Sequence, residues 1–378
     1  MRILATIGGL LLLSIILWDA FETIILPRRV TRRFRLARLV YRTTWLPWSA
    51  IARRMRAGSW RESFLSFYGP LSLLWLFGFW VVALIASFAL LQWGLGSGFI
   101  VVNGTVDFSA DLYMSGTTFF TLGLGDVTPR TPQARLVTMV EAGTGFGFLA
   151  IIISYLPVLY GAFSQREVNI SLLDARAGSP PSAGELLRRH GQTQSAKALG
   201  QYLRDWEAWS AQLMESHLSY PVLCFFRSQH NNQSWLAALT AILDACALLI
   251  AYAQGDLKSQ AELTFAISRH TVVDLAQVMH IPPRPPRSDR LSAGALAELR
   301  SLLAACGAAS GGGGAREAKL SQLQGMYEPY VNGLADRLLM PLPPWTPTES
   351  VDNWRTSAWG RISALPSSLS ESEGDEHF

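Results

Sequence analysis

Residues 121–126 read Thr-Leu-Gly-Leu-Gly-Asp and lie in the segment 92–133, which separates two long apolar segments. Gly123 and Gly125 permit backbone dihedrals that residues with a Cβ atom rarely adopt. Two alternate glycines alone have little specificity, so their surroundings decide what they mean. Those surroundings, taken outward from residue 121, predict a loop that enters a membrane and returns.

Composition and hydropathy favour a membrane protein. The chain has 378 residues, of which 49% are apolar, and its mean hydropathy is positive. A hydrocarbon layer of about 30 Å requires about 20 helical residues to cross. Three apolar segments meet this length: 3–26, 67–91 and 135–163. The residues after 164 are polar enough to form a separate soluble domain.

The basic residues predict the orientation of these helices. Eleven arginines and no acidic residue lie between Arg28 and Arg61, and short loops this basic stay in the cytoplasm. The first helix then leads inward, the second runs outward and the third returns. The first helix is therefore expected to be retained rather than cleaved as a signal peptide. We expect a multi-pass protein of the cell membrane with its N-terminus outside and its C-terminal domain in the cytoplasm.

Segment 92–133 is too long for a simple connection and predicts a short helix of its own. Asp107 and Ser109 are suitable N-cap residues for a helix over 109–120. Its C-terminal end would carry partial negative charge toward the membrane interior, which favours a cation there. Non-helical backbone at membrane depth is tolerated only where protein or water surrounds it. The segment therefore predicts a re-entrant helix followed by a loop.

The sequence TLGLGD at 121–126 resembles the signature T-x-G-[YF]-G-D of the potassium-channel family, two-transmembrane and pore-loop type. The resemblance covers residues 67–164 and implies a filter whose backbone carbonyl oxygens replace the water around a dehydrated ion. It implies K⁺ sites at four residues, Thr121, Leu122, Gly123 and Leu124, with Gly125 completing the filter. It also implies that Asp126, at the outer mouth, accepts hydrogen bonds from the pore-helix region.

The resemblance implies a function and an assembly. One filter loop occurs in the chain and the family places four around an axis, so a homotetramer is implied. The expected activity is passive K⁺ conduction across the plasma (inner) membrane, with no cofactor besides the permeant ion. Leu124 replaces the usual Tyr or Phe, as in some filters of the two-pore subfamily, and Phe120 replaces a frequent second Thr. A weakly selective cation channel is the alternative that Leu124 leaves open.

The third apolar segment contains candidates for gating. Gly143, Gly145, Gly147 and Pro157 allow either a hinge or close helix packing, and the sequence does not separate these two readings. Glu141 lies six residues into this helix, where an unpaired carboxylate is costly. We expect it to face protein or water, either behind the filter or as a hydrogen-bond acceptor without a role in permeation.

The arginine-rich segment suggests contact with lipid. Four arginines recur at every third position, namely Arg29, Arg32, Arg35 and Arg38. An interfacial helix on anionic headgroups, within 28–61, is favoured over a voltage sensor because the segment lies between Pro27 and Pro47 in an inner loop. We expect Asp19 and Glu22 to pair with the arginines that follow, Arg28, Arg29 or Arg32.

The expected fold class is an all-α membrane protein, with three transmembrane helices plus a re-entrant pore helix and filter, followed by a soluble all-α cytoplasmic domain. The expected divisions are a first transmembrane helix at 1–26, an Arg-rich cytoplasmic linker at 27–66, a pore domain at 67–164 with its inner helix at 132–164, a cytoplasmic helical domain at 165–340 and a largely disordered tail at 341–378. Helical periodicity predicts five helices in the soluble domain: 182–218, 234–254, 260–280, 292–306 and 316–339.

Segment 235–253 is apolar enough for a fourth membrane helix. Asp244 interrupts it, however, and crossing would place several later arginines outside, so a buried helix in a soluble bundle is expected. No G-x-G-x-x-G, metal-ligand spacing or nucleophile–base pair occurs, so we expect no enzyme, metal cofactor or nucleic-acid partner. A non-conducting, membrane-anchored scaffold with a helical partner-binding domain is the alternative from another class, and the sequence does not identify any cytoplasmic ligand.

Overall fold

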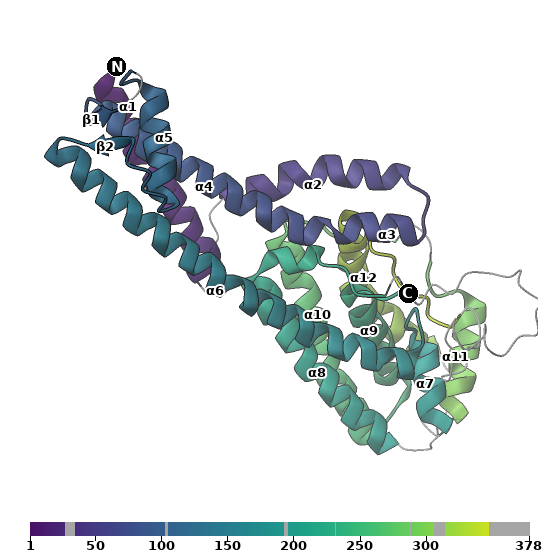
Figure 1. The fold of residues 1–378 in the computed structure, drawn as a ribbon. Helices are drawn as coiled ribbons and strands as arrows, with labels where there is room; N and C mark the ends of the chain where they lie inside the picture. Colours follow the sequence, from purple (N-terminus) through teal and green to yellow (C-terminus); the bar gives the residue numbers. More distant parts are fainter. Residues whose placement is uncertain are drawn as a thin grey trace, which may run out of the picture. The chain divides into compact units, whose positions relative to one another are not determined.

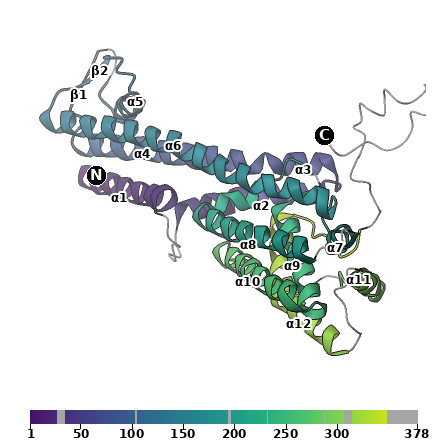
Figure 2. The same ribbon diagram turned by 90° about the horizontal axis from the view of Figure 1, so that it is seen from below.

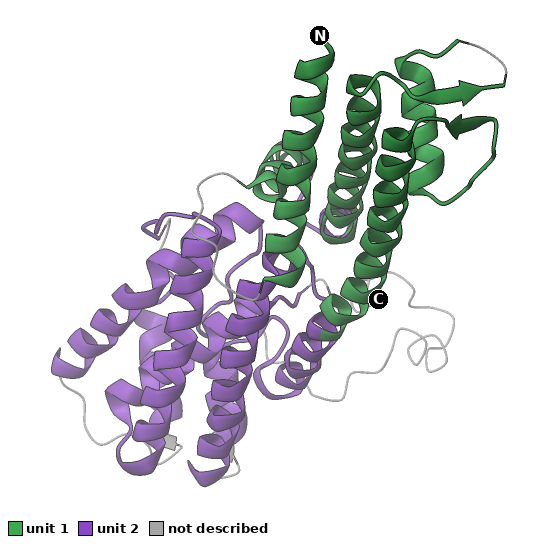
Figure 3. Ribbon diagram, turned by 90° about the vertical axis from the view of Figure 1, so that its left-hand side faces the viewer, with its two compact units in different colours: residues 1–53, 67–161 green, residues 54–66, 162–378 purple. Residues whose placement is uncertain are grey.

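The computed structural model describes residues 1–26, 35–102, 105–192, 196–230, 232–286, 289–305 and 314–347. These residues are mostly helical, as the sequence predicted, with one two-stranded sheet (Figure 1). They form two compact units, shown in separate colours in Figure 3. Unit 1 holds 1–53 and 67–161, and unit 2 holds 54–66 and the residues from 162 onward.

Unit 1 is built from long apolar helices with a small sheet at one end (Figure 3). Its elements are α1 (Arg2–Ala20) with the π-helical turn η1 (Phe21–Ile25), α2 (Leu36–Arg54), α4 (Tyr68–Gly94), β1 (Phe99–Val101), α5 (Phe108–Phe119), β2 (Val127–Pro129) and the first part of α6 (Pro132–Ala177). The strands pair antiparallel, with Ile100 opposite Thr128.

Unit 2 is a helical bundle. Its elements are α3 (Ser59–Ser66), the end of α6, α7 (Ala183–Gln192), α8 (Ala196–Ser219), the 3₁₀ turn η2 (Pro221–Phe225), α9 (Trp235–Tyr252), α10 (Gly255–Val278), α11 (Ala293–Ala305) and α12 (Gly314–Leu338). Cys224 and Cys246 are buried free thiols in this unit, whereas Cys306 lies outside the described residues.

Helix α1 packs closely along α4, and Figure 2 shows the two side by side. Glycines make the approach possible. A Cβ atom on Gly9 would lie 2.9 Å from the carbonyl oxygen of Ser87, and one on Gly94 would lie 2.2 Å from Oγ1 of Thr6. Small residues at such crossings let helix backbones approach, which is how apolar helices associate in lipid.

Among the residues that the structure describes, four stretches of helix are long and apolar enough to cross a membrane: Arg2–Ile25, Ser59–Gly94, Pro132–Ala177 and Trp235–Tyr252. In the first three, at most 44% of the most apolar window is buried within the structure, so much of their apolar surface is open to lipid or to other chains. In the fourth, which is α9, 94% is buried. Helix α9 therefore forms the core of the unit 2 bundle.

Asp244 has its partners inside that bundle. Its carboxylate is fully buried and accepts hydrogen bonds from the guanidinium of Arg290 and from the hydroxyl of Tyr327 on α12. A buried charge persists only when it is paired in this way. The acidic residue that interrupts the apolar sequence of α9 is thus a core ion pair.

Three predicted helix boundaries were wrong. The helix predicted over 260–280 is α10, which begins at Gly255. The predicted helix 182–218 is divided, because α7 ends at Gln192 and α8 begins at Ala196. The inner helix does not end at 164 but continues to Ala177. The continuation is amphipathic: Arg166, Ile170, Leu173 and Ala177 are all at most 3% exposed and lie on one face of the helix.

The described part of the arginine-rich linker contains α2. This helix lies within 28–61, where an interfacial helix was expected, and it passes through Pro47 to Arg54. An internal proline costs a helix about 3 kcal/mol. Trp45 and Trp48, on either side of it, both pack on Tyr68, with ring centroids 4.6 and 5.9 Å away, and this burial offsets the cost. Arg28, Arg29 and Arg32, like the tail from 348, lie outside the described residues.

Candidate ion-conduction site

The short helix of the loop, α5, starts with a side-chain cap. Oδ1 of Asp107 accepts from the backbone N–H of Ala110 at 3.0 Å and from Oγ of Ser109 at 2.6 Å. Asp107 is therefore the N-cap, and Ser109 supports it instead of sharing the role. The helix runs from Phe108 to Phe119, one residue before the predicted 109–120 at each end.

The loop that follows α5 has an alternating backbone. Thr121, Gly123 and Gly125 have φ angles of 57°, 58° and 83°, whereas Leu122 and Leu124 are not in the left-handed region. The glycines were predicted to supply such dihedrals, but the same conformation at Thr121 was not predicted. A left-handed threonine is strained, and strain of this kind persists at functional sites.

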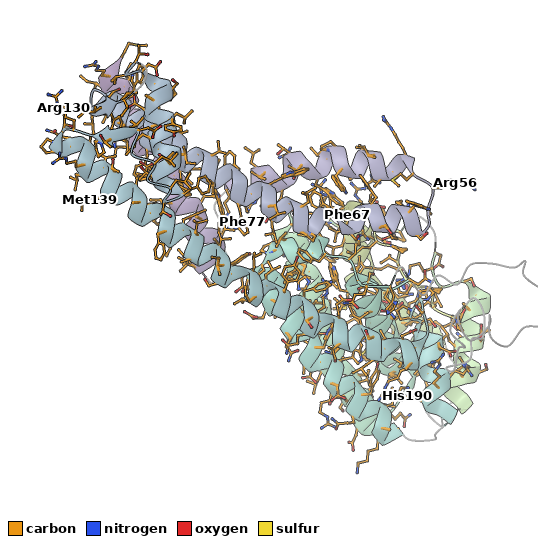
Figure 4. All side chains as sticks on the ribbon, in the orientation of Figure 1. Arg56, Phe67, Phe77, Arg130, Met139 and His190 are labelled. Carbon is orange, nitrogen blue, oxygen red and sulfur yellow. The ribbon has the colours of Figure 1, made fainter. Side chains whose placement is uncertain are left out.

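The surface of this loop is apolar and open in the single chain. Phe120, Leu122 and Leu124 are 48%, 59% and 62% exposed. The exposed face continues along α6 through Leu136, Met139, Phe146 and Ile153, each at least 63% exposed. Met139 projects from the free side of α6 in Figure 4. An apolar face of this size marks a surface that contacts lipid or another protein chain.

Asp126 at the end of the loop is held by three contacts. The hydroxyl of Tyr113 on α5 donates to its carboxylate. Its Oδ1 also accepts from the N–H of Val127 at 3.1 Å, and its carbonyl oxygen accepts from the N–H of Val102 at 3.0 Å. Tyr113 is thus the residue of α5 that contacts Asp126. Sequence reasoning did not name it, although its type and its place in α5 were the available signal.

The flank before the loop is fixed to α5, and the two flanks are fixed to each other. Oγ of Ser97 donates to the buried carboxylate of Asp111 at 2.7 Å. The N–H of Arg130 donates to the carbonyl of Gly98 at 2.7 Å, next to the β1–β2 pairing. These strands were not predicted, because three-residue strands leave no periodic signal.

Glu141 lies between three helices. It is 1% exposed, and its carboxyl contacts the hydroxyl of Ser115 on α5, which is also 2.8 Å from the carbonyl oxygen of Ile85 on α4. A serine hydroxyl has one hydrogen to donate. Both contacts are hydrogen bonds only when Glu141 carries the second proton. Glu141 thus faces protein and ties α6 to α5 and, through Ser115, to α4.

The hinge candidates of α6 have different surroundings. A Cβ atom on Gly145 would lie 2.4 Å from the carbonyl oxygen of Phe119, the last residue of α5. Gly143 and Gly147 have no atom within 4 Å of such a Cβ in the chain. Pro157 lies inside the continuous helix. Gly145 is therefore needed for packing against α5. Gly143 and Gly147 do not have this requirement within the described residues of the chain.

Asp19 has hydrogen-bond partners among the described residues, whereas the arginines predicted to pair with it, Arg28, Arg29 and Arg32, lie outside them. Its carboxylate accepts from the backbone N–H groups of Leu36 and Ala37, each at 3.0 Å, and from Nε1 of Trp80 at 3.0 Å. It therefore caps α2 from another helix and joins it to α4. Glu22 accepts from Nε1 of Trp18 at 2.6 Å. Within the described residues, no group of three or more His, Cys, Asp or Glu side chains is placed to hold a metal ion.

The elements just described coincide with a known sequence family. Residues 71–159 match the family model described as "Ion channel". The match runs from α4 through α5 and the loop 121–126 into α6. The chain is also similar to an uncharacterized membrane protein of Bacillus subtilis (strain 168), YdjJ, with 21% identity over 254 residues that cover 64% of this chain and 73% of that protein. No solved structure matches the chain. The chain is therefore a membrane protein in which residues 71–159 are similar to the ion channel family.

Proposed function

We propose that the protein is a passive, potassium-preferring channel formed by four copies of the chain. The observation that carries this proposal is the left-handed backbone at alternate residues, Thr121, Gly123 and Gly125. This alternation turns successive carbonyl oxygens toward one side of the loop. Four such loops around an axis would surround an ion with oxygens at Thr121, Leu122, Gly123 and Leu124 in place of water.

The tetramer is supported by the apolar surface that a single chain leaves exposed. The filter residues Leu122 and Leu124 are more than half exposed, and an exposed apolar stripe continues along α6. A fourfold arrangement would bury these surfaces between copies around a shared pore. Polar backbone at membrane depth also requires a protein or water-filled environment. Permeant K⁺ is the substrate of this pore, and we propose no catalytic chemistry.

We propose that unit 2 is cytoplasmic and that the N-terminus is outside, because the arginine-rich segment 28–61 follows the first apolar helix. The burial of α9 supports three crossing helices rather than four. Anionic lipid headgroups are the proposed partners of this segment. Arg42, Arg54 and Arg56 are exposed, Leu39 is 55% exposed beside them, and Arg56 projects into open space in Figure 4.

Potassium flux from liposomes that contain the purified protein tests the proposal. Gly123→Asp and Gly125→Asp should abolish the flux, since an aspartate side chain strains the left-handed backbone and adds charge to the filter. Gly314→Asp is the matched control, because nothing lies within 4 Å of a Cβ atom there. Flux that survives both substitutions would contradict an ion path through this loop, and no flux from the wild-type protein would favour a non-conducting scaffold.

A weakly selective cation pore is the second candidate. Leu124 favours it, because leucine lacks the aromatic ring that supports the filter from behind in the potassium-channel family that this loop resembles. Reversal potentials in mixed K⁺ and Na⁺ separate the two candidates. A reversal potential that follows the K⁺ gradient supports potassium preference, and one near zero in symmetrical total cation supports the weakly selective pore.

A further inference from the structure

An eight-residue segment of unit 2, 221–228, lies between α8 and α9 and is here named the coupling segment. It consists of η2 and the three residues after it. Val222, Leu223 and Cys224 are at most 3% exposed, so the segment is part of the bundle core. Its polar groups bind two helices that continue into the ion channel domain. Helix α3 precedes α4 directly, and α6 carries the chain away from the filter.

The contact with α6 centres on a buried arginine. Arg166 is 3% exposed and donates to the carbonyl oxygens of Leu223 and Phe226, each at 3.0 Å. The next residue of α6, Glu167, accepts from Oγ of Ser228 at 3.2 Å and from Nε of Arg166 at 2.8 Å. A buried guanidinium that loses such acceptors is strongly destabilising, so α6 is tightly held to the segment.

The contact with α3 is made by Arg227, which lies between Phe226 and Ser228. The side chain of Arg227 is 7% exposed, and its Nη1 lies 3.4 Å from Oε2 of Glu62 on α3. The same guanidinium donates to the carbonyl oxygens of Leu338 and Leu339 at the end of α12, with 3.2 Å to the second. Neighbouring residues 226 and 227 therefore hold α6 on one side, and α3 and α12 on the other.

We propose that the coupling segment regulates the pore by moving α3 and α6 together when the helical bundle changes conformation. This inference rests on the proposed channel function. The segment is short, buried and bonded through backbone carbonyls, so it transmits a displacement instead of absorbing it. A change in α8, α9 or α12 then reaches the helices before and after the filter at the same time, which is the physical requirement for coupling a remote domain to a gate.

The test is the open probability of single channels in planar bilayers. Glu62→Gln keeps a polar side chain on half-buried α3 but removes its charge pair with Arg227. The ratio of open to closed time should change by about 5- to 150-fold, the range typical of coupled sites. Unitary conductance and the reversal potential should stay unchanged, whereas a merely structural defect in the pore would alter them. Arg204→Gln, at an exposed position on α8, is the control that should change nothing.

Hydrogen exchange on the full-length protein gives a readout that does not depend on conduction. Arg227→Gln should raise amide exchange both in α3 and in the last turn of α12, and Arg204→Gln should raise it in neither. An unchanged open probability in Glu62→Gln, or unchanged exchange in α3, would overturn the coupling and leave the channel intact. A wild-type protein that passes no K⁺ would instead overturn the proposed function.

Discussion

Gly145→Ala tests whether the glycines of α6 serve packing or bending. The new methyl group would lie 2.4 Å from the carbonyl oxygen of Phe119 and 3.0 Å from its Cα, and both are backbone atoms. Real Cβ contacts below 3.0 Å are essentially absent, so the end of α5 must move by about 0.6 Å or more, the difference between 3.0 and 2.4 Å.

The size of the effect follows from overpacking. Extra methyl groups in packed sites cost about 1–3 kcal/mol. A difference of that size changes the ratio of two conformations by about 5- to 150-fold. Because Phe119 is two residues before Thr121, the displaced backbone is that at the start of the proposed filter, and functional geometry of this kind tolerates shifts of only about 0.5 Å. K⁺ flux should therefore fall by a similar factor.

Liposome flux at equal protein density is the assay, with Gly143→Ala as the matched control two residues away. No atom of the chain lies within 4 Å of the control methyl group, so helix propensity alone predicts a gain of about 0.5–1 kcal/mol in stability. Retained flux in Gly145→Ala together with lost flux in Gly143→Ala would refute the packing argument and assign bending to Gly143.

Three other variants test separate parts of the structure. Tyr113→Phe removes the hydroxyl donor to Asp126, so K⁺ current should decline faster during sustained conduction; equal rates in patch recordings would exclude a role for this bond. Asp244→Leu leaves Arg290 with only the more distant Glu328, whose Oε1 is 3.8 Å from its Nε, and should lower the unfolding free energy of unit 2 by about 3 kcal/mol, the lower end of the range for a broken buried pair, in denaturant titrations; a loss below about 1 kcal/mol would count against a core ion pair. Burial, and then the charge of Arg166, hold the pKa of His217 well below 6.5, so below that pH the unfolded chain binds a proton that the folded chain does not. The free energy of unfolding should therefore fall by up to about 1.4 kcal/mol for each unit by which the pH drops below 6.5. His217→Gln should make this fall less steep, as measured by hydrogen exchange.

Features with a local physical signal were predictable from the sequence. Apolar length located the long helices, a capping aspartate located the start of α5, and two glycines located left-handed backbone in the loop. The continuation of α6 was predictable in principle from the spacing of Ile170, Leu173 and Ala177. The prediction ended this helix at 164 because polar residues become frequent there. A helix that leaves an apolar environment changes from wholly apolar to amphipathic, so these polar residues do not mark its end.

Other features depend on partners that are distant in the sequence. The contact of Gly145 with Phe119 spans 26 positions, and that of Arg166 with Phe226 spans 60. Asp19 likewise accepts a hydrogen bond from the indole N–H of Trp80, which is 61 positions later in the sequence. Nothing in the flanking residues encodes such pairings, so hinge and packing glycines could not be separated, and the coupling segment could not be recognised.

Helix α6 is anchored at two places that frame its central part. Near the loop 121–126, Gly145 brings it against the backbone of α5, and 21 positions later Arg166 fixes it within unit 2. Pro157 lies in the span between these anchors and offers no N–H to the turn before it. A helix bends most readily where a backbone hydrogen bond is missing, so any bend of α6 is expected at this proline, between its two anchored parts and away from the loop 121–126.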